Sequence, residues 1–189
     1  MTMGINITSN NAFKKLSEKI KADSNKKLEV GIMIPDIATI GMYLEYGWVQ
    51  SVTSKQGHYL SAQLGLPPNN KFTTLYMPPR PFMRATYAHK RAEWQEIFRK
   101  YFLKTFDITY SLKTMGQAAV DDIVQTIDNA GIPAGSFPKR SALTMALFEA
   151  TGEIAKVRKA KGGGKLANNV NTTKPLTLTG VLRTSIQAK

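Results

Sequence analysis

The residue types that most often perform chemistry in proteins are sparse in this sequence. It contains no cysteine and two histidines, His58 and His89. Without cysteine there are no disulfides, thiolate nucleophiles, iron–sulfur clusters or common structural zinc sites, and the chain suits a reducing cytoplasm. Neither histidine is part of a His-x-Glu or Glu-x-x-His motif, so the sequence offers few residues that could form a metal site or a histidine-based catalytic triad. We expect no catalytic residue, no cofactor and no bound metal, with His58 at a loop tip and His89 structural or on the surface of a helix.

Two further patterns superficially suggest chemistry. The run from Gly162 to Lys165 is similar to a phosphate-binding loop, but Lys159 stands where its first glycine belongs and Leu166 replaces the Ser or Thr that holds the metal. We interpret it as a glycine linker. Asp121 and Asp122 are adjacent, so on a helix they diverge by ~100° and form a poor carboxylate pair. We expect them on a solvated face.

Charge is the strongest compositional signal. The chain has 26 Lys and Arg against 13 Asp and Glu, a net charge of +13, which favours an anionic partner. Residues 151–189 alone hold eight basic residues and one acidic residue. Such a segment contacts phosphates without reading bases, although contact with a protein or plain solvation fits it better. The candidate anionic-partner contacts are Lys156, Arg158, Lys159, Lys161 and Lys165.

Length and hydropathy limit the architecture. The 189 residues, 42% of them hydrophobic, suffice for one domain with extensions. No run approaches the ~18 apolar residues of a membrane span, and the N-terminal segment lacks the features of a signal peptide. We expect a soluble protein that is not exported and does not contact a membrane.

Apolar periodicity predicts the elements of the N-terminal half. The spacing predicts an amphipathic helix over 10–22 and a strand from Leu28 to Ile34 that Pro35 stops. Asp36 is the expected cap of a helix that ends near Gly47. Residues 48–77 mix aromatic, β-branched and turn residues, which predicts extended segments or a long hairpin.

The C-terminal half begins with the most helical part of the chain. A long helix is predicted over 81–106, and a second one runs through Met115 to Ile127 until Gly131 and Pro133 end it. Residues 141–150 suit a short helix or a strand. We expect Thr179 to cap a short final helix that includes Ile186.

The resulting fold class is α+β, a small mostly antiparallel sheet packed against a long helix, with extended loops and a basic C-terminal arm. Residues 1–130 form the expected core domain. Residues 131–189 form the expected arm, which packs on the core or on a neighbouring subunit.

Three short segments stand out in this framework. Glu45, Tyr46 and Gly47 end the first core helix, residues 77–84 (MPPRPFMR) open the long helix, and residues 175–186 (PLTLTGVLRTSI) lie near the end. The prolines preset the backbone before the long helix, and Arg80 and Arg84 can lie on one side of it.

In this order the three segments resemble the neck, or tail-completion, proteins of tailed bacteriophages, a group of head–tail joining and virion morphogenesis proteins. Those proteins typically show a Glu-Phe-Gly-like signature, a PPRPF segment before a long helix and a C-terminal PL-x-x-TG-x-L-x-x-SI signature. Here Tyr46 replaces the Phe, Pro78 to Phe82 match directly, and Leu178 stands where Asp is frequent. The third signature is matched by Pro175, Leu176, Thr179, Gly180, Leu182, Ser185 and Ile186.

The resemblance implies a non-enzymatic structural protein of the virion neck, assembled in the host bacterial cytoplasm. Its implied partners are copies of itself in a ring, with six favoured over twelve, the head-side adaptor or portal complex, and the tail terminator or tail tube. The expected subunit or partner interface residues are Glu45, Tyr46, Gly47, Arg80, Pro81, Phe82, Arg84, Thr179, Gly180, Leu182 and Ser185. Arg80, Phe82 and Arg84 would support either a subunit interface or the junction between sheet and helix.

Two other classes of function remain open. The net charge of +13 suits a non-specific duplex-DNA-binding protein, and this reading overlaps with the first because a neck ring surrounds the exiting genome. A nuclease or other enzyme is the weakest alternative.

Overall fold

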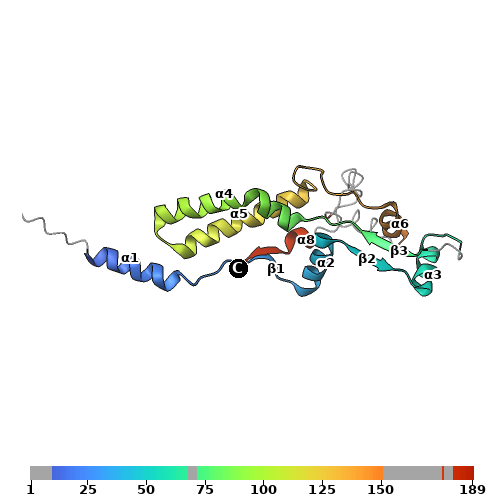
Figure 1. The fold of residues 1–189 in the computed structure, drawn as a ribbon, viewed down its shortest axis with the longest axis horizontal. Helices are drawn as coiled ribbons and strands as arrows, with labels where there is room; N and C mark the ends of the chain where they lie inside the picture. Colours follow the sequence, from blue (N-terminus) through green and yellow to red (C-terminus); the bar gives the residue numbers. More distant parts are fainter. Residues whose placement is uncertain (1–9, 68–71, 151–175, 177–180) are drawn as a thin grey trace, which may run out of the picture.

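The computed structural model describes residues 10–67, 72–150, 176 and 181–189, and the fold is α+β, as predicted. Helices and short strands alternate as far as α4, and the helices α5, α6 and α8 then precede the last described strand (Figure 1). The helices are α1 (Asn10–Asp23), α2 (Pro35–Tyr46), α3 (Ser54–Gln63), α4 (Phe82–Thr105), α5 (Ile108–Asp128), α6 (Ala142–Ala150) and α8 (Val181–Thr184). The strands are β1 (Val30–Ile32), β2 (Trp48–Ser51), β3 (Thr74–Met77) and β4 (Ile186–Ala188).

A hairpin of two long helices, α4 and α5, forms the centre of the molecule (Figure 1). Phe106 ends α4 in the left-handed conformation, with φ 50°, and the Asp107 carboxylate accepts from the Tyr110 N–H to start α5. The hydroxyls of Thr86 and Thr126 join the two helices at 2.7 Å in their buried seam. The long helix predicted over 81–106 is confirmed, and the next helix starts earlier than its apolar pattern indicated.

Each described sheet has two strands. β1 pairs antiparallel with β4, and β2 pairs antiparallel with β3 from Trp48 opposite Met77 to Ser51 opposite Thr74. The β1–β4 sheet packs on α5, where Gly116 allows a close approach: a Cβ there would lie 2.8 Å from a methyl of Leu28 and 3.0 Å from the Cβ of Ala188. Residues distant in sequence therefore close one layer of the core.

The core lies where α4, α5 and the C-terminal segment meet. Its centre is Phe82, which is fully buried, together with Ile127, Phe137 and Leu182. Residues beyond 130, expected to form an arm, thus contribute part of the core in the described ranges. The partly buried hydrophobic residues around it include Val30, Ile32, Ile37 and Leu44.

The structure corrects four local predictions. Asp36 does not cap α2: the helix begins at Pro35, with Ile34 in the cap position and no side-chain bond there, because Pro is well suited to the first helical turn. The final helix stops at Thr184, and Ile186 is a β4 residue because its backbone pairs with Ile32. The strand predicted from Leu28 to Ile34 is shorter, Val30–Ile32.

The fourth correction concerns residues 48–77. The predicted hairpin strands are present, but α3 lies between them, so His58 is in a helix and not at a loop tip. Thr53 and Gln56 form a reciprocal capping box that starts α3, a start signal that the turn-rich composition obscured. Residues 141–150 adopt the helical alternative, as α6.

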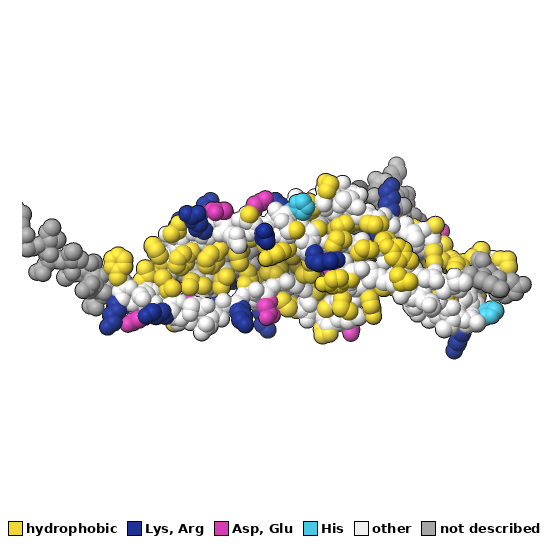
Figure 2. All heavy atoms as spheres, viewed as in Figure 1, with side chains coloured by type: hydrophobic (Ala, Val, Ile, Leu, Met, Phe, Trp, Pro, Cys, Tyr) yellow, Lys and Arg dark blue, Asp and Glu magenta, His cyan; other side chains and the backbone are white. Residues whose placement is uncertain are grey.

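The molecule is elongated (Figure 1). α1 projects at one end, and α3 with the ends of β2 and β3 projects at the other. Hydrophobic side chains form a nearly continuous band along the face shown in Figure 2. Among the described residues, no helix is both long and apolar enough to cross a bilayer.

Candidate functional site

Glu45 joins the first two motif segments. The residue is 5% exposed, and its carboxylate accepts from the backbone N–H groups of Met83, at 3.0 Å, and Arg84, at 2.9 Å. These donors lie in the first turn of α4, which has no side-chain cap of its own because Pro81 occupies the cap position. Glu45 on α2 therefore caps a helix that starts far along the chain, and its negative charge suits that helix terminus.

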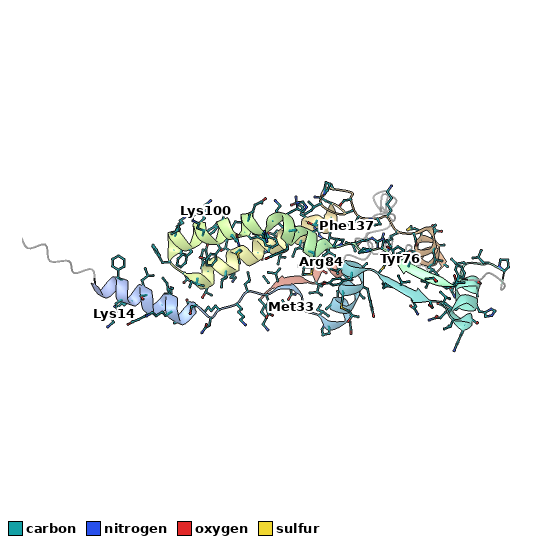
Figure 3. The ribbon with its side chains drawn as sticks, viewed as in Figure 1. Lys14, Met33, Tyr76, Arg84, Lys100 and Phe137 are labelled. Atoms are coloured by element: carbon teal, nitrogen blue, oxygen red, sulfur yellow. The ribbon has the colours of Figure 1, made fainter. Side chains whose placement is uncertain are left out.

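Arg84 completes this contact from the α4 side. Its Nε donates to the Glu45 carboxylate at 3.1 Å, and its terminal NH2 group donates to the Glu45 carbonyl oxygen at 2.9 Å. The guanidinium carbon also lies 4.4 Å from the centre of the Tyr46 ring. Arg84 and Tyr46 keep exposed surface, and Figure 3 shows Arg84 beside α2 at the start of α4. They are the members of this set that a partner can reach.

Gly47 is required by backbone crowding. Its φ is +71°, and a Cβ at this position would lie 2.6 Å from the Met77 carbonyl oxygen and 2.8 Å from the Pro79 nitrogen. Both are backbone atoms in the proline segment, and they cannot rotate away as a side chain can. The glycine lets the chain leave α2 directly against residues 77–79.

Arg80 holds the loop that follows α5. It is 5% exposed, and its guanidinium donates to the carbonyl oxygens of Pro138, at 2.9 Å, and Lys139, at 3.1 Å. Its backbone N–H donates to the Leu44 carbonyl oxygen at 2.7 Å. Burial lowers the pKa of the Arg80 side chain from its usual value. The sequence placed Arg80 beside Arg84, but the two guanidinium groups serve different partners.

The third motif segment reaches the same region. Leu182 and Leu176 belong to the core cluster around Phe82, and the buried Ser185 hydroxyl donates to the Leu182 carbonyl oxygen at 2.7 Å at the end of α8. Thr179 and Gly180 lie outside the described residues. The three motif segments thus meet at one intramolecular junction, which we call the α2–α4 junction: residues 45–47, 77–84, 176 and 182–185.

The junction gives the predicted interface residues an internal role. Of the three residues in the sequence hypothesis, Phe82 and Arg80 are buried within the chain and Arg84 pairs with the buried Glu45, which favours the junction between sheet and helix. A role of the set at a subunit interface stays a prediction. The basic candidates Lys156, Arg158, Lys159, Lys161 and Lys165 all lie outside the described residues.

Sequence reasoning missed the exposed apolar surface beside the junction. Val49 is 68% exposed, Tyr76 65% and Tyr43 47%, and all three lie on α2 or the β2–β3 sheet. We use the name α2–β3 apolar surface for the exposed apolar side chains of these elements, which on α2 lie on more than one side of the helix: Ile40, Met42, Tyr43, Tyr46, Val49 and Tyr76. The sequence did contain a signal for this exposed surface: the apolar residues of 37–49 fall on more than one side of the helix, so the core cannot bury all of them.

A groove lies next to this surface. It has a volume of about 660 Å³ and lies between α2, β3 and α6, with Arg80 and Arg140 in its wall. Burial, and then the nearby charge of Arg80, lower the pKa of Arg140 to about 10. Within the described ranges, no three His, Asp or Glu side chains gather closely enough to hold a metal ion.

Comparisons of the chain with models of protein families, with curated proteins and with solved structures found no match. The functional argument therefore depends on the residues and their geometry.

Proposed function

We propose that this protein is a structural component of the neck of a tailed bacteriophage, a ring-forming head–tail connector or tail-completion protein without catalytic activity. The observation that carries the proposal is the α2–α4 junction. The three segments on which the family resemblance depends are far apart in sequence, yet they contact one another through Glu45, Arg84 and Phe82. Motifs that form one structural unit are better support for a shared architecture than three independent short matches.

The shape and surface of the subunit fit assembly. A ring is built from repeated heterologous interfaces, in which one patch of a subunit meets a different patch of its neighbour. The elongated molecule carries projections at both ends (Figure 1) and the α2–β3 apolar surface between them. Exposed apolar patches of this kind are common at protein interfaces. A homo-oligomeric ring, with six copies favoured, then contacts the head-side adaptor or portal complex and the tail terminator or tube.

The experiment that tests the proposal is electron microscopy of particles made by a phage with an early stop codon in this gene, grown in a non-suppressing host. We expect full heads and finished tails that do not join, or tails of uncontrolled length. The matched control is the same phage in a suppressor host, which restores joined particles. Normal infectious particles without suppression would remove the neck assignment.

Non-specific binding to duplex DNA is the second candidate, and the net charge of +13 favours it. This candidate predicts duplex affinity that falls steeply as salt rises, because each neutralised phosphate releases counterions. Replacing the five basic residues between 156 and 165 by glutamine should then reduce both the affinity and the slope. Affinity that is insensitive to salt, or unchanged in that variant, would reject a role for this segment.

A further inference from the structure

Positive charge is concentrated at one end of the elongated molecule. Residues 10–27 and 95–114 together contain ten Lys and Arg against four Asp and Glu. They form α1 with the segment after it, the second half of α4 and the start of α5, which lie toward the same end in Figure 1. We call this the basic end. By contrast, residues 28–94 and 115–150 contain eight residues of each sign and are neutral as a whole.

The fold holds the two parts of the basic end together. The Lys19 ammonium group on α1 lies 3.0 Å from the carboxylate of Asp107, the residue that starts α5. α1 is thereby tied to the turn between α4 and α5. Figure 3 labels Lys14 on α1 and Lys100 on α4, both toward this end of the molecule. Cations from three helices are therefore brought together by the fold.

Most of these cations have no counterion in the chain. Three of the four acidic residues of the basic end are already in ion pairs, each with a cation of the same end. The segments that the structure does not describe hold one acidic residue in total, Glu153, so their placement cannot neutralise the basic end. Seven exposed lysines form no ion pair with any described residue: Lys14, Lys15, Lys21, Lys27, Lys100, Lys104 and Lys113.

The residue type favours phosphates over a protein surface. Nine of the ten cations are Lys, and the tenth is Arg99. Protein interfaces are enriched in Arg and depleted in Lys, whereas a lysine ammonium group is a point charge that can follow phosphates in many geometries. Duplex DNA presents one negative charge per ~1.7 Å of its axis. α1 has 14 residues and is about 20 Å long, so its lysines can follow about six base pairs.

From these observations we infer that the basic end binds the phosphate backbone of duplex DNA without reading its sequence. The unpaired lysines of α1, α4 and α5 replace counterions that the duplex releases. This surface is separate from residues 156–165, which were considered above for DNA contact, so it holds or fails independently of that segment. It is also independent of the neck role. Purified protein tests the basic end, whereas particles test the neck role.

The test measures fluorescence anisotropy of a labelled duplex of about 20 base pairs, titrated with the full chain over a range of salt concentrations. One variant removes a lysine from each helix of the basic end: Lys14→Gln, Lys100→Gln and Lys113→Gln. A matched control removes three exposed cations from the neutral part of the chain: Lys55→Gln, Arg91→Gln and Lys139→Gln. The two variants have the same net charge, so any difference between them reports where the duplex binds.

The expected effect follows from counterion release. The logarithm of the affinity changes by about −0.9 per phosphate contact for each tenfold rise in salt, so one lost contact costs about eightfold at about 0.1 M salt. We expect the basic-end variant to bind at least about tenfold more weakly, with a salt slope smaller by about 1–3. The control variant should stay within about twofold of the wild type. Duplexes of two different sequences should bind equally well, because phosphate contacts carry no sequence information.

Several results would overturn the inference. Equal losses in the two variants would show that net charge alone attracts the duplex, and an unchanged affinity in the basic-end variant would place the contact elsewhere. Vesicles with about 30% phosphatidylserine and polyglutamate serve as competitors. If either displaces the duplex at an equal concentration of negative charge, the basic end is a lipid-binding or protein-binding surface instead. Circular dichroism checks that both variants keep the helical content of the wild type.

Discussion

Glu45 acts on two groups at once: it caps the first turn of α4 and it pairs with Arg84. A buried carboxylate is costly unless several donors compensate it, and here two backbone N–H groups and the Arg84 Nε do so. The charge is therefore part of the structure of the junction. Neutral replacements should destabilise the fold even when their shape is retained.

We expect Glu45→Gln to lower the free energy of unfolding by about 1–2 kcal/mol and Glu45→Ala by about 3 kcal/mol, since each leaves buried donors unpaired. Urea unfolding monitored by circular dichroism measures both. Glu93→Gln is the control. Glu93 is an exposed residue of α4 that forms an ion pair with Lys90, three residues earlier on the same helix. Its replacement should change the free energy of unfolding by less than about 0.5 kcal/mol. Equal effects at the two sites would contradict the capping role.

Gly47 and Gly65 both have positive φ, at +71° and +63°, but they differ in their surroundings. Gly47→Ala should destabilise by about 3 kcal/mol or more, because backbone strain adds to contacts with backbone atoms. Within the part of the chain that the structure describes, a Cβ added at Gly65 has no heavy atom within 4 Å. Gly65→Ala should therefore lower the free energy of unfolding by about 1 kcal/mol, the cost of the left-handed backbone alone. Thermal unfolding of the two variants separates crowding from conformation. Equal shifts in the unfolding temperature would mean that the Met77–Pro79 backbone gives way.

At the scale of elements, α5 begins with a cap that also holds α1. Asp107 accepts from the Tyr110 N–H and lies 3.0 Å from the Lys19 ammonium group. These two partners, in that order, hold the Asp107 pKa below its usual 3.8. The charged form is therefore favoured in the folded state, and its contribution is present above pH 3.8 and is lost as pH falls through the lower folded value.

The prediction is that Asp107→Asn removes this part of the acid sensitivity. The wild-type unfolding temperature should fall toward that of Asp107→Asn as pH drops below 3.8, with the largest difference near neutral pH. Differential scanning calorimetry across this range measures it. Asp121→Asn, on the exposed side of α5, is the control. A constant difference at all pH values would contradict the assignment.

The elements that the sequence predicts best are those with strong periodicity. Residues 81–106 carry a long apolar stripe, and their helix was found within one or two residues. By contrast, the boundary at Ile186 depends on a partner strand far away in sequence, which local pattern does not report. The candidate site follows the same rule: the motif residues were recognised, but the mutual contacts of Glu45 and Arg84 required the fold. Arg140 was missed because its environment comes from α6 and Arg80.

At the scale of the whole molecule, the α2–β3 apolar surface is the part of the subunit that the proposed ring would cover. Its members include Tyr43 and Val49, which do not line the groove between α2, β3 and α6. If the ring proposal holds, this surface is covered by a neighbouring subunit. Placing charge there should then oppose association without unfolding the chain.

We expect Tyr43→Lys with Val49→Lys to shift sedimentation from oligomer toward monomer while circular dichroism stays unchanged. Leu103→Lys is the matched control, because Leu103 is 58% exposed on α4 and lies near the opposite end of the molecule. Analytical ultracentrifugation over a range of concentrations measures the shift. Dissociation by Leu103→Lys alone would move the interface to the α4–α5 end.

The pairing of β1 with β4 also affects the order in which the chain folds during its synthesis. Ile32 meets Ile186, so during translation β1 leaves the ribosome long before its partner exists. At ~5–20 residues per second, the wait is on the order of 10–30 s. The α4–α5 hairpin depends on local contacts and can form within that interval, whereas the apolar side of β1 stays uncovered. The nascent chain is thus most exposed to chaperones and proteases through its N-terminal strand, and self-association through a finished core can begin only after residues 182–188 have been made.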